Sequence, residues 1–469
     1  MDAAKTADSN SVLNSIRERI ASDVPTGWRL TTLGECFKWS SGGTPRRSDP
    51  SYYGGEIPWA VIGDLNDGVI TETQSSITNA GFQNSSAKWV ESGSVLVAMY
   101  GSIGKLAIAG RRLTTNQAIA FTKPDPVDPK YLYYYLLWQR PSLARLGKGA
   151  TQLNISQTVL KQFPFLLAPP NEQRRVVAEI DKQFSSLEEA VANLKRIKAN
   201  LKRYKAAVLT AAVKGELVPN EYEIATRADE AVKSGGDLLG EILAAHRSCW
   251  QGRGRYKEPA GPRTEWLFPL PKGWTWATVG QIAYSVKDGP HYSPKYSDSG
   301  IPFISGGNVR PEGIDFSTTK FISPNLHAEL SKRCKPDYGD LLYTKGGTTG
   351  IARVNTERRE FNVWVHVAVL KICPNVNPFY VQHALNSDHC YKQAQLYTHG
   401  VANQDLGLTR MVRITIPIPP RPQQDRIVIE VDRRLSVVSG LEADVDANLD
   451  RAVGIRRAMI ARHFHAQGY

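Results

Sequence analysis

The chain has 469 residues, and at roughly 150 residues per domain this length predicts about three structural units. Hydrophobic residues make up 41% and charged residues 22%, which excludes a globally disordered or a fibrous chain and predicts sizeable buried cores. The 58 basic and 45 acidic residues leave a net charge of +13, so a polyanion, above all nucleic acid, is the first partner to consider.

The sequence carries no signal for export or for a membrane. No stretch approaches the roughly 18 consecutive apolar residues of a membrane span, and residues 1–25 lack the apolar core of a secretory signal. The five cysteines are scattered and never form a C-x-x-C pair, which is typical of reduced thiols rather than of disulfides or a zinc site. We therefore expect a cytoplasmic protein without a bound metal, whose mostly buried cysteines are Cys36, Cys249, Cys334, Cys373 and Cys390.

An internal repeat organises the chain. Pro25-Thr26-Gly27-Trp28 recurs as Pro271-Lys272-Gly273-Trp274. Three further pairs follow in the same order, Ile57-Pro58-Trp59 with Ile301-Pro302-Phe303, Gly101-Ser102-Ile103-Gly104 with Gly347-Thr348-Thr349-Gly350, and Glu172–Val177 with Gln423–Val428. Because the order is kept while the separation drifts by a few residues, the pattern indicates two half-chains related by duplication, with insertions in loops.

The predicted elements run in the same order in both half-chains. Residues 1–24 form an N-terminal helical segment. Residues 25–170 and 271–420 hold short apolar runs broken by Gly, Pro, Asn and Ser, which is typical of short strands with irregular loops. One helix interrupts each of these domains, over 129–139 and 378–386, with proline near its start.

Each half-chain ends in a long helix. Residues 171–217 form the first, with Asn171 as the expected N-cap, and residues 421–469 form the second. Both carry apolar residues at alternating spacings of three and four, the a/d seam of a coiled coil. Over 177–208 the first helix is about 48 Å long, so the seams predict an antiparallel pair that acts as a spacer; packing of each helix on its own domain is the alternative. The seam positions are Val177, Ile180, Phe184, Leu187, Val191, Leu194, Leu201 and Val208 in the first helix, and Val428, Val431, Leu435, Val438, Val445, Leu449, Ala452 and Met459 in the second.

Between the half-chains, residues 218–270 are polar and locally basic, which predicts a flexible linker with one short helix over 237–249. All these elements together place the chain in the α+β class. We expect two similar α/β domains of short strands and irregular loops, separated by two long helices that pack as an antiparallel coiled coil with pseudo-two-fold symmetry.

No catalytic motif is complete. Gly101–Leu106 is similar to a phosphate-binding P-loop, but Met99 stands at the position of the earlier glycine and Leu106 replaces the Ser/Thr that holds magnesium. Gly346–Gly350 has the wrong spacing for a dinucleotide-binding turn, and no histidine has companions at metal-ligand spacing. We therefore predict no catalytic residue, while a stand-alone nuclease or methyltransferase with an unrecognised site stays the alternative.

Three loops in each half-chain have the composition of DNA contacts. In the first loop an arginine follows flexible glycines, so its guanidinium can reach a phosphate or a guanine. In the second a hydroxyl and a lysine at a tight turn suit a phosphate, and in the third a side-chain amide can pair with adenine. Any one loop alone has a surface turn as its alternative, but their equivalent places in both half-chains favour binding. The candidates in the first half-chain are Thr44, Arg46, Arg47, Tyr100, Ser102, Lys105, Lys148, Gln152 and Asn154. Those in the second are Lys287, His291, Lys345, Thr348, Thr349, His399 and Asn403.

Several of these motifs occur together in one known family. They are the Pro-x-Gly-Trp entry, the Pro-Pro-x-x-Gln start of the long helices, Gly42–Pro45 followed by Tyr52–Gly55 and Ile57–Trp59, and Ala206–Leu217 at the end of the first long helix. Over nearly its full length the chain resembles the specificity (S) subunits of type I restriction-modification systems. The second half-chain departs from the pattern, because Lys287–His291 stands where the first has Gly-Gly-Thr-Pro.

The resemblance implies two target recognition domains, residues 25–170 and 271–420, that each read one half of an asymmetric bipartite target in double-stranded DNA. It implies that the chain is not itself an enzyme and binds no cofactor. Two modification subunits would carry S-adenosylmethionine and methylate adenine, and restriction subunits would cleave DNA with ATP and Mg²⁺. The helices would dock the modification subunits and set the spacer, with half-site centres about one turn of DNA, 10 to 10.5 bp, apart.

Overall fold

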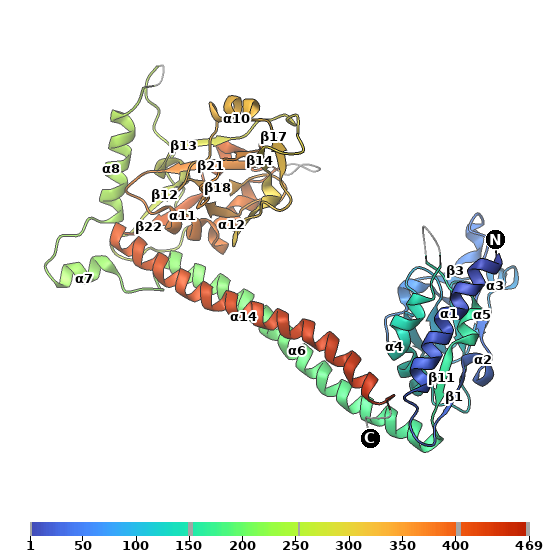
Figure 1. Cartoon of the computed structure of the whole chain (residues 1–469). Helices are drawn as coiled ribbons and strands as arrows, with labels where there is room; N and C mark the ends of the chain where they lie inside the picture. The colour runs from blue at the N-terminus through green and yellow to red at the C-terminus, as the bar shows by residue number, and fades with distance from the viewer. Residues whose placement is uncertain (1, 149–152, 252–253, 400–404, 466–469) are drawn as a thin grey trace. The chain divides into compact units, whose positions relative to one another are not determined.

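The computed structural model describes residues 2–148, 153–251, 254–399 and 405–465 (Figure 1). Two compact units divide the chain: unit 1 comprises Met1–Lys195 with Asp446–Tyr469, and unit 2 comprises Arg196–Val445. Each unit joins one strand-rich domain, here called domain 1 or domain 2, to parts of two long helices. These helices are α6 (Pro170–Lys214) and α14 (Arg421–Arg462).

Domain 1 is made of short strands in two main sheets and a small ladder. Its strands are β1 (Arg29–Thr32), β2 (Ser40–Ser41), β3 (Tyr53–Ala60), β4 (Val69–Ile70), β5 (Ser76–Ile77), β6 (Trp89–Val90), β7 (Val95–Ala98), β8 (Leu106–Ala109), β9 (Leu113–Thr115), β10 (Ile119–Thr122) and β11 (Pro164–Leu167). The helices of unit 1 before α6 are α1 (Asp2–Ala21), α2 (Leu33–Cys36), α3 (Asn79–Gln83), α4 (Pro129–Arg145) and α5 (Gln157–Gln162). The strand orders are β2-β10-β7-β8-β4, β5-β3-β9-β6 and β1-β11.

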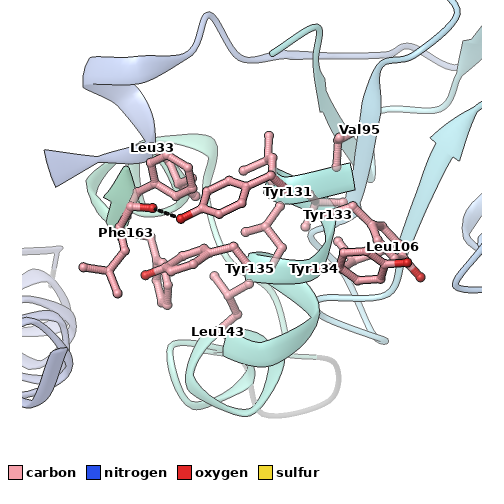
Figure 2. Close-up of a cluster of buried hydrophobic side chains, with 14 of the residues drawn as sticks. Leu33, Val95, Leu106, Tyr131, Tyr133, Tyr134, Tyr135, Leu143 and Phe163 are labelled. Carbon is pink, nitrogen blue, oxygen red and sulfur yellow. Dashed lines mark hydrogen bonds between the residues drawn. The ribbon is translucent and has the colours of Figure 1, made fainter. Parts of the chain in front are cut away.

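A row of tyrosines on α4 fills the core of unit 1 (Figure 2). Tyr131 and Tyr135 are fully buried, and their hydroxyls donate hydrogen bonds to the backbone oxygens of Leu166 (2.8 Å) and Pro164 (2.9 Å). A buried aromatic side chain stabilises a core most when its polar tip is also hydrogen-bonded. These tyrosines therefore hold α4 firmly against β11.

Domain 2 is built in the same way. Its strands are β12 (Thr275–Thr278), β13 (Ala283–Asp288), β14 (Ile301–Ile304), β15 (Val309–Arg310), β16 (Gly313–Ile314), β17 (Lys320–Ile322), β18 (Leu341–Thr344), β19 (Ala352–Val354), β20 (Asn362–Val363), β21 (Val367–Ile372) and β22 (Thr415–Ile418). The remaining helices of unit 2 are α7 (Glu221–Arg227), α8 (Gly235–Ser248), α9 (Val279–Ile282), α10 (Pro324–Ser331), α11 (Pro378–Leu385), α12 (Asp388–Tyr397) and α13 (Leu408–Met411). The strand orders are β13-β21-β18-β19, β17-β14-β20, β12-β22 and β15-β16.

The two domains repeat one topology. The order β2-β10-β7-β8 in domain 1 corresponds to β13-β21-β18-β19 in domain 2, β5-β3-β9 to β17-β14-β20, and β1-β11 to β12-β22. In both domains one pair of the second sheet is parallel, β3 with β9 and β14 with β20. The two α/β domains expected from the repeat are therefore present in the fold.

The repeated Pro-x-Gly-Trp motif forms the same turn at the start of each domain. Gly27 and Gly273 have φ angles of +83° and +81°. In both turns the tryptophan N–H donates a hydrogen bond to the carbonyl oxygen of the motif's proline, over 3.0 and 3.1 Å. A positive φ at the third residue of such a turn favours glycine, which explains why the motif carries one there.

The long helices α6 and α14 contact each other in both units and run antiparallel (Figure 1). In unit 1 the Arg456 guanidinium lies 4.6 Å from the ring centroid of Phe184, and in unit 2 Lys205 forms an ion pair of 2.5 Å with Glu442. A later residue of α6 thus meets an earlier residue of α14. All sixteen predicted seam residues are buried or half-buried. The predicted antiparallel pair of helices is confirmed.

Three details of the helices differ from the prediction. Helix α6 begins at Pro170, so Asn171 lies inside its first turn and is not the N-cap. Proline suits the first helical position because its missing N–H has no intrahelical acceptor there. Helix α4 continues through Pro141 to Arg145, beyond its predicted end. The linker also holds a second helix, α7, whose N-terminal N–H groups are capped by the Asn220 side chain.

The cysteines are all free thiols. Cys334, Cys373 and Cys390 are buried, Cys36 is half-buried and Cys249 is exposed. Burial raises the pKa of Cys334 and of Cys390 to about 12, so both thiols are protonated at neutral pH. No helix within the described ranges is long and apolar enough to cross a membrane.

Candidate nucleic-acid interface

Two of the candidate loops of domain 1 leave the same edge of its five-stranded sheet. Ser41, at the end of β2, and Ala98, at the end of β7, pair with neighbouring residues at the start of β10. Because both strands run antiparallel to β10, they end on the same side of the sheet. The loops over 42–47 and 99–105 that follow them are therefore neighbours.

The third candidate loop is joined to the second by backbone hydrogen bonds. The Gly101 N–H donates to the Leu153 carbonyl over 2.8 Å, and Lys148 and Asn154 exchange two bonds of 2.9 Å each. These contacts bring all three predicted loops of domain 1 to one place. The loop edge of domain 1 is defined here as residues 42–47, 99–105, 148 and 153–154.

A buried and a half-buried aromatic side chain, Trp59 and Tyr53, hold the first loop in place. The Trp59 indole donates to the carbonyl oxygen of Gly43 (3.0 Å), and the Tyr53 hydroxyl donates to that of Pro45 (2.7 Å). A Cβ atom on Gly42 would lie 1.9 Å from a neighbouring backbone oxygen, so only glycine fits there. The motifs Gly42–Pro45, Tyr52–Gly55 and Ile57–Trp59 thus fix the backbone from which Arg46 projects.

The loop edge of domain 1 presents basic and polar side chains to solvent. Arg46 and Arg47 are exposed, and within the described ranges neither guanidinium has a hydrogen-bond or ion-pair partner. Tyr100 and Ser102 are exposed as well. The half-buried candidates are Thr44, whose hydroxyl donates to Gln117, and Lys105, Lys148 and Asn154. Gln152 lies outside the described residues.

Domain 2 builds the same edge from equivalent strands. Asp288, at the end of β13, and Thr344, at the end of β18, pair with neighbouring residues at the start of β21. Asp405 forms bridges with Gly346 and with His399, as Asn154 does with residues of the second and third loops of domain 1. The loop edge of domain 2 is defined here as residues 287–291, 345–350, 399 and 405.

Four of the seven candidates in domain 2 are exposed, namely Lys287, His291, Thr348 and His399. Asn403 lies outside the described residues. Thr349 is buried, and its hydroxyl oxygen has no hydrogen-bond partner in the described part of the chain.

Lys345 lies below the surface, contrary to the expectation of a phosphate contact. Its exposed fraction is 2%, and its ammonium lies 3.0 Å from a carboxylate oxygen of Asp405 and 3.4 Å from one of Asp288. The charge of Lys345 is therefore compensated inside the domain. A direct contact with DNA does not fit this placement.

Sequence reasoning also missed a cluster of basic residues beside Lys287. One hollow is lined by Lys287, Lys332, Arg333, Lys335 and Lys371 together with Asp337, which forms an ion pair of 2.7 Å with Lys371. The short basic run after α10 is the signal that could have indicated it. Arg333 additionally donates to Asp288 over 2.9 Å, which connects this cluster to the loop edge of domain 2.

The topology argues against the catalytic motifs considered for the sequence. Residues 101–105 form the turn of a hairpin between the antiparallel strands β7 and β8, and residues 345–351 join β18 to β19 in the same way. A P-loop and a dinucleotide-binding turn both need a strand followed by a helix, whose N-terminus receives the phosphate. Among the residues that the structure describes, no group of three or more His, Cys, Asp or Glu side chains is arranged to hold a metal ion.

The family model of the Type I restriction modification DNA specificity domain matches residues 25–203 and 271–439. The chain belongs to this family. It carries the family's domain twice, and each matched stretch begins at a Pro-x-Gly-Trp turn and runs into a long helix.

Relatives in this family differ in how much of the chain they match. The specificity subunit of the type I restriction enzyme EcoDI from Escherichia coli is 20% identical over 466 residues, which cover 95% of this chain and 90% of that subunit. The HindI specificity subunit from Haemophilus influenzae is 26% identical over 174 residues, 35% of this chain and only 38% of that subunit's length. A solved chain from work on complex assembly and conformational transition of the type I R-M system has a TM-score of 0.62 at 16% identity, covering 94% of this chain and 98% of its own length, and so shares the fold.

Proposed function

We propose that this chain is the DNA-recognition subunit of a type I restriction-modification complex, in which each domain reads one half of an asymmetric bipartite target. The observation that carries the proposal is the pair of loop edges. They lie at equivalent places on the equivalent sheets of the two domains, yet they are lined with different side chains. Neutralised phosphates supply affinity for any sequence, while base edges supply specificity. Different side chains at equivalent places therefore predict different half-sites.

Within each loop edge, the exposed basic residues are proposed as the phosphate or guanine contacts. In domain 1 these are Arg46 and Arg47, supported by Lys105 and Lys148. The hydroxyl and amide groups nearby suit hydrogen bonds to phosphates and to adenine. The proposed polar contacts are Thr44, Tyr100, Ser102, Gln152 and Asn154 in domain 1, and His291, Thr348, His399 and Asn403 in domain 2, where Lys287 is the exposed basic contact and the buried Thr349 hydroxyl is not proposed as one.

We further propose that the chain binds two modification subunits, one at each of two equivalent grooves. In unit 1, Arg456 and Ile460 of α14 line a groove with α4. In unit 2, Lys205 and Leu209 of α6, at the equivalent helix positions of the repeat, line a groove with α11 and α12. A groove that occurs twice suits two copies of one partner. Restriction subunits would join this assembly.

The chemistry in this proposal belongs to the partners. The modification subunits would bind S-adenosylmethionine and methylate adenine, the restriction subunits would use ATP and Mg²⁺, and this chain would bind none of these cofactors. Because the target is the genome, the complex would work in the cytoplasm. The paired helices α6 and α14 would set the number of unread base pairs between the half-sites.

The test is to express the chain with and without its modification subunits in a host that lacks the system, and to map methylated adenines in the genome. We expect methylation of one asymmetric bipartite sequence, and only when both kinds of subunit are present. The purified chain alone, incubated with DNA, Mg²⁺ and labelled S-adenosylmethionine, should show no turnover. Turnover by the lone chain would favour a stand-alone enzyme, and equal binding of all DNA sequences by the complex would refute recognition.

A further inference from the structure

An ionic cluster with a buried lysine at its centre joins the three segments of the loop edge in domain 2. Lys345 follows β18, Asp288 ends β13, and Asp405 follows the third loop. The Lys345 ammonium lies between the two carboxylates, at 3.0 Å from Asp405 and 3.4 Å from Asp288. The side chains of Lys345 and Asp288 are only 3% and 2% exposed, whereas that of Asp405 is 43% exposed. One cation thus contacts all three segments that carry the candidate DNA contacts.

The three equivalent positions of domain 1 carry uncharged residues. Met99 takes the backbone position of Lys345: its N–H donates to Ala118 and its carbonyl accepts from Ile155, just as the Lys345 N–H and carbonyl bond His366 and Leu406. Met99 packs into the hydrophobic core of unit 1. Ser41 and Asn154 take the places of Asp288 and Asp405.

Two further side chains, Arg333 and His291, contact the Asp288 carboxylate. Arg333 donates to the second oxygen of Asp288 over 2.9 Å, and His291 lies 3.4 Å from this carboxylate. Asp288 therefore keeps the Arg333 guanidinium as an ion-pair partner without Lys345. Asp405 depends on it more, because within the described ranges Lys345 is its only ion-pair partner. Removing the charge of Lys345 therefore leaves the buried Asp288 carboxylate with Arg333 as its cation, and it releases the half-exposed Asp405 carboxylate from its tie to the end of β13.

We propose that Lys345 is a positioning residue for sequence recognition by domain 2, which holds Asp405 and the turn after β18 against the end of β13. This inference rests on the proposed function. It assigns Lys345 no contact with DNA. Recognition by domain 1 needs no such cluster, because backbone bonds and the apolar Met99 make the same junction there.

The first test is Lys345→Met in the complex with the modification subunits. The variant copies the residue of domain 1 but leaves Asp288 and Asp405 without their shared cation. We expect methylation of the target to fall at least tenfold, and tolerance of base changes to rise in the half-site read by domain 2 alone. Lys392→Met is the matched control, because it removes an exposed lysine from Asp388 in the same domain, and we expect less than a twofold change.

The second test removes the two carboxylates together with the lysine. The variant Lys345→Met/Asp288→Ser/Asp405→Asn reproduces the three residues of domain 1, and we expect it to recover methylation to within about threefold of the wild type. Recovery supports positioning, since a lost phosphate contact would not return. An unchanged Lys345→Met variant, or equal impairment of the single and triple variants, overturns the proposal. If the wild-type complex itself shows no sequence selectivity, the proposed function fails instead.

Discussion

Replacing Arg46 and Arg47 together by alanine tests the loop edge of domain 1 most directly. Both side chains are exposed, and their guanidinium groups have no partner within the described ranges. The bonds from Trp59 and Tyr53 to the carbonyl oxygens of this loop hold its backbone, so the substitution removes charge without removing the loop's own supports. The double variant should therefore fold and assemble like the wild type.

The expected loss follows from counterion release. Each neutralised phosphate contributes about 0.9 to the slope of log K against log salt concentration, so two lost contacts lower the slope by about 1.8. With equal affinities of the variant and the wild type at 1 M salt as the reference, the affinity of the variant for DNA should be about 60-fold lower at 0.1 M salt but only about 18-fold lower at 0.2 M. This dependence on salt distinguishes lost phosphate contacts from a damaged fold.

The measurement is fluorescence anisotropy of labelled duplex DNA with the assembled complex, over a series of salt concentrations. The control is Arg111→Ala/Arg112→Ala, which removes the same charge. These arginines follow the end of β8, whereas the loop over 99–105 precedes its start, so they lie at the opposite end of the sheet from the loop edge. Its slope should match the wild type. If the Arg46/Arg47 variant keeps the wild-type slope, or if both double variants lose affinity alike, these arginines do not contact phosphates.

Three further outcomes are expected. Lys105→Ala should lower DNA affinity about eightfold at 0.1 M salt while gel filtration shows an intact complex. Phe464→Ala removes a fully buried ring that stacks on Trp138 with ring centroids 5.2 Å apart, and it should lower the free energy of unfolding by about 3–5 kcal/mol in a denaturant titration. The control Val453→Ala changes a side chain that is 58% exposed and should cost less than about 0.5 kcal/mol. Four residues inserted after Ala192 add about 6 Å of helix and should change the spacer between mapped half-sites, while a change within either half-site would contradict the spacer role.

The long helices and the turns were predictable because their signals are local. A seam that repeats over many turns, from Val177 to Val208, needs no knowledge of the rest of the fold. The glycine of each Pro-x-Gly-Trp turn likewise reports its own positive φ angle. The start of α6 was wrong by one residue because proline and asparagine both suit a helix start, and the sequence does not decide between them.

The sequence indicated the candidate loops, but it did not predict which of their side chains are exposed. That the three loops lie together follows from the pairing of β2 and β7 with β10, a long-range arrangement that no local pattern reports. Lys345 has the composition of a surface contact, a lysine before glycines and threonines. It is buried because Asp288 and Asp405, both distant in the sequence, face its ammonium. Burial of a charge depends on partners that only the fold brings near.

The shared and the differing residues of the two domains divide along their physical roles. The residues that repeat fix the backbone: a Cβ atom on Gly42 or on Gly289 would lie 1.9 or 1.8 Å from a backbone oxygen. The residues that differ, such as Met99 and Lys345, change what fills and supports the edge while the backbone bonds around them stay the same. A duplicated scaffold of this kind lets each loop edge change its side chains without disturbing the sheet. That separation is what two independent half-sites require.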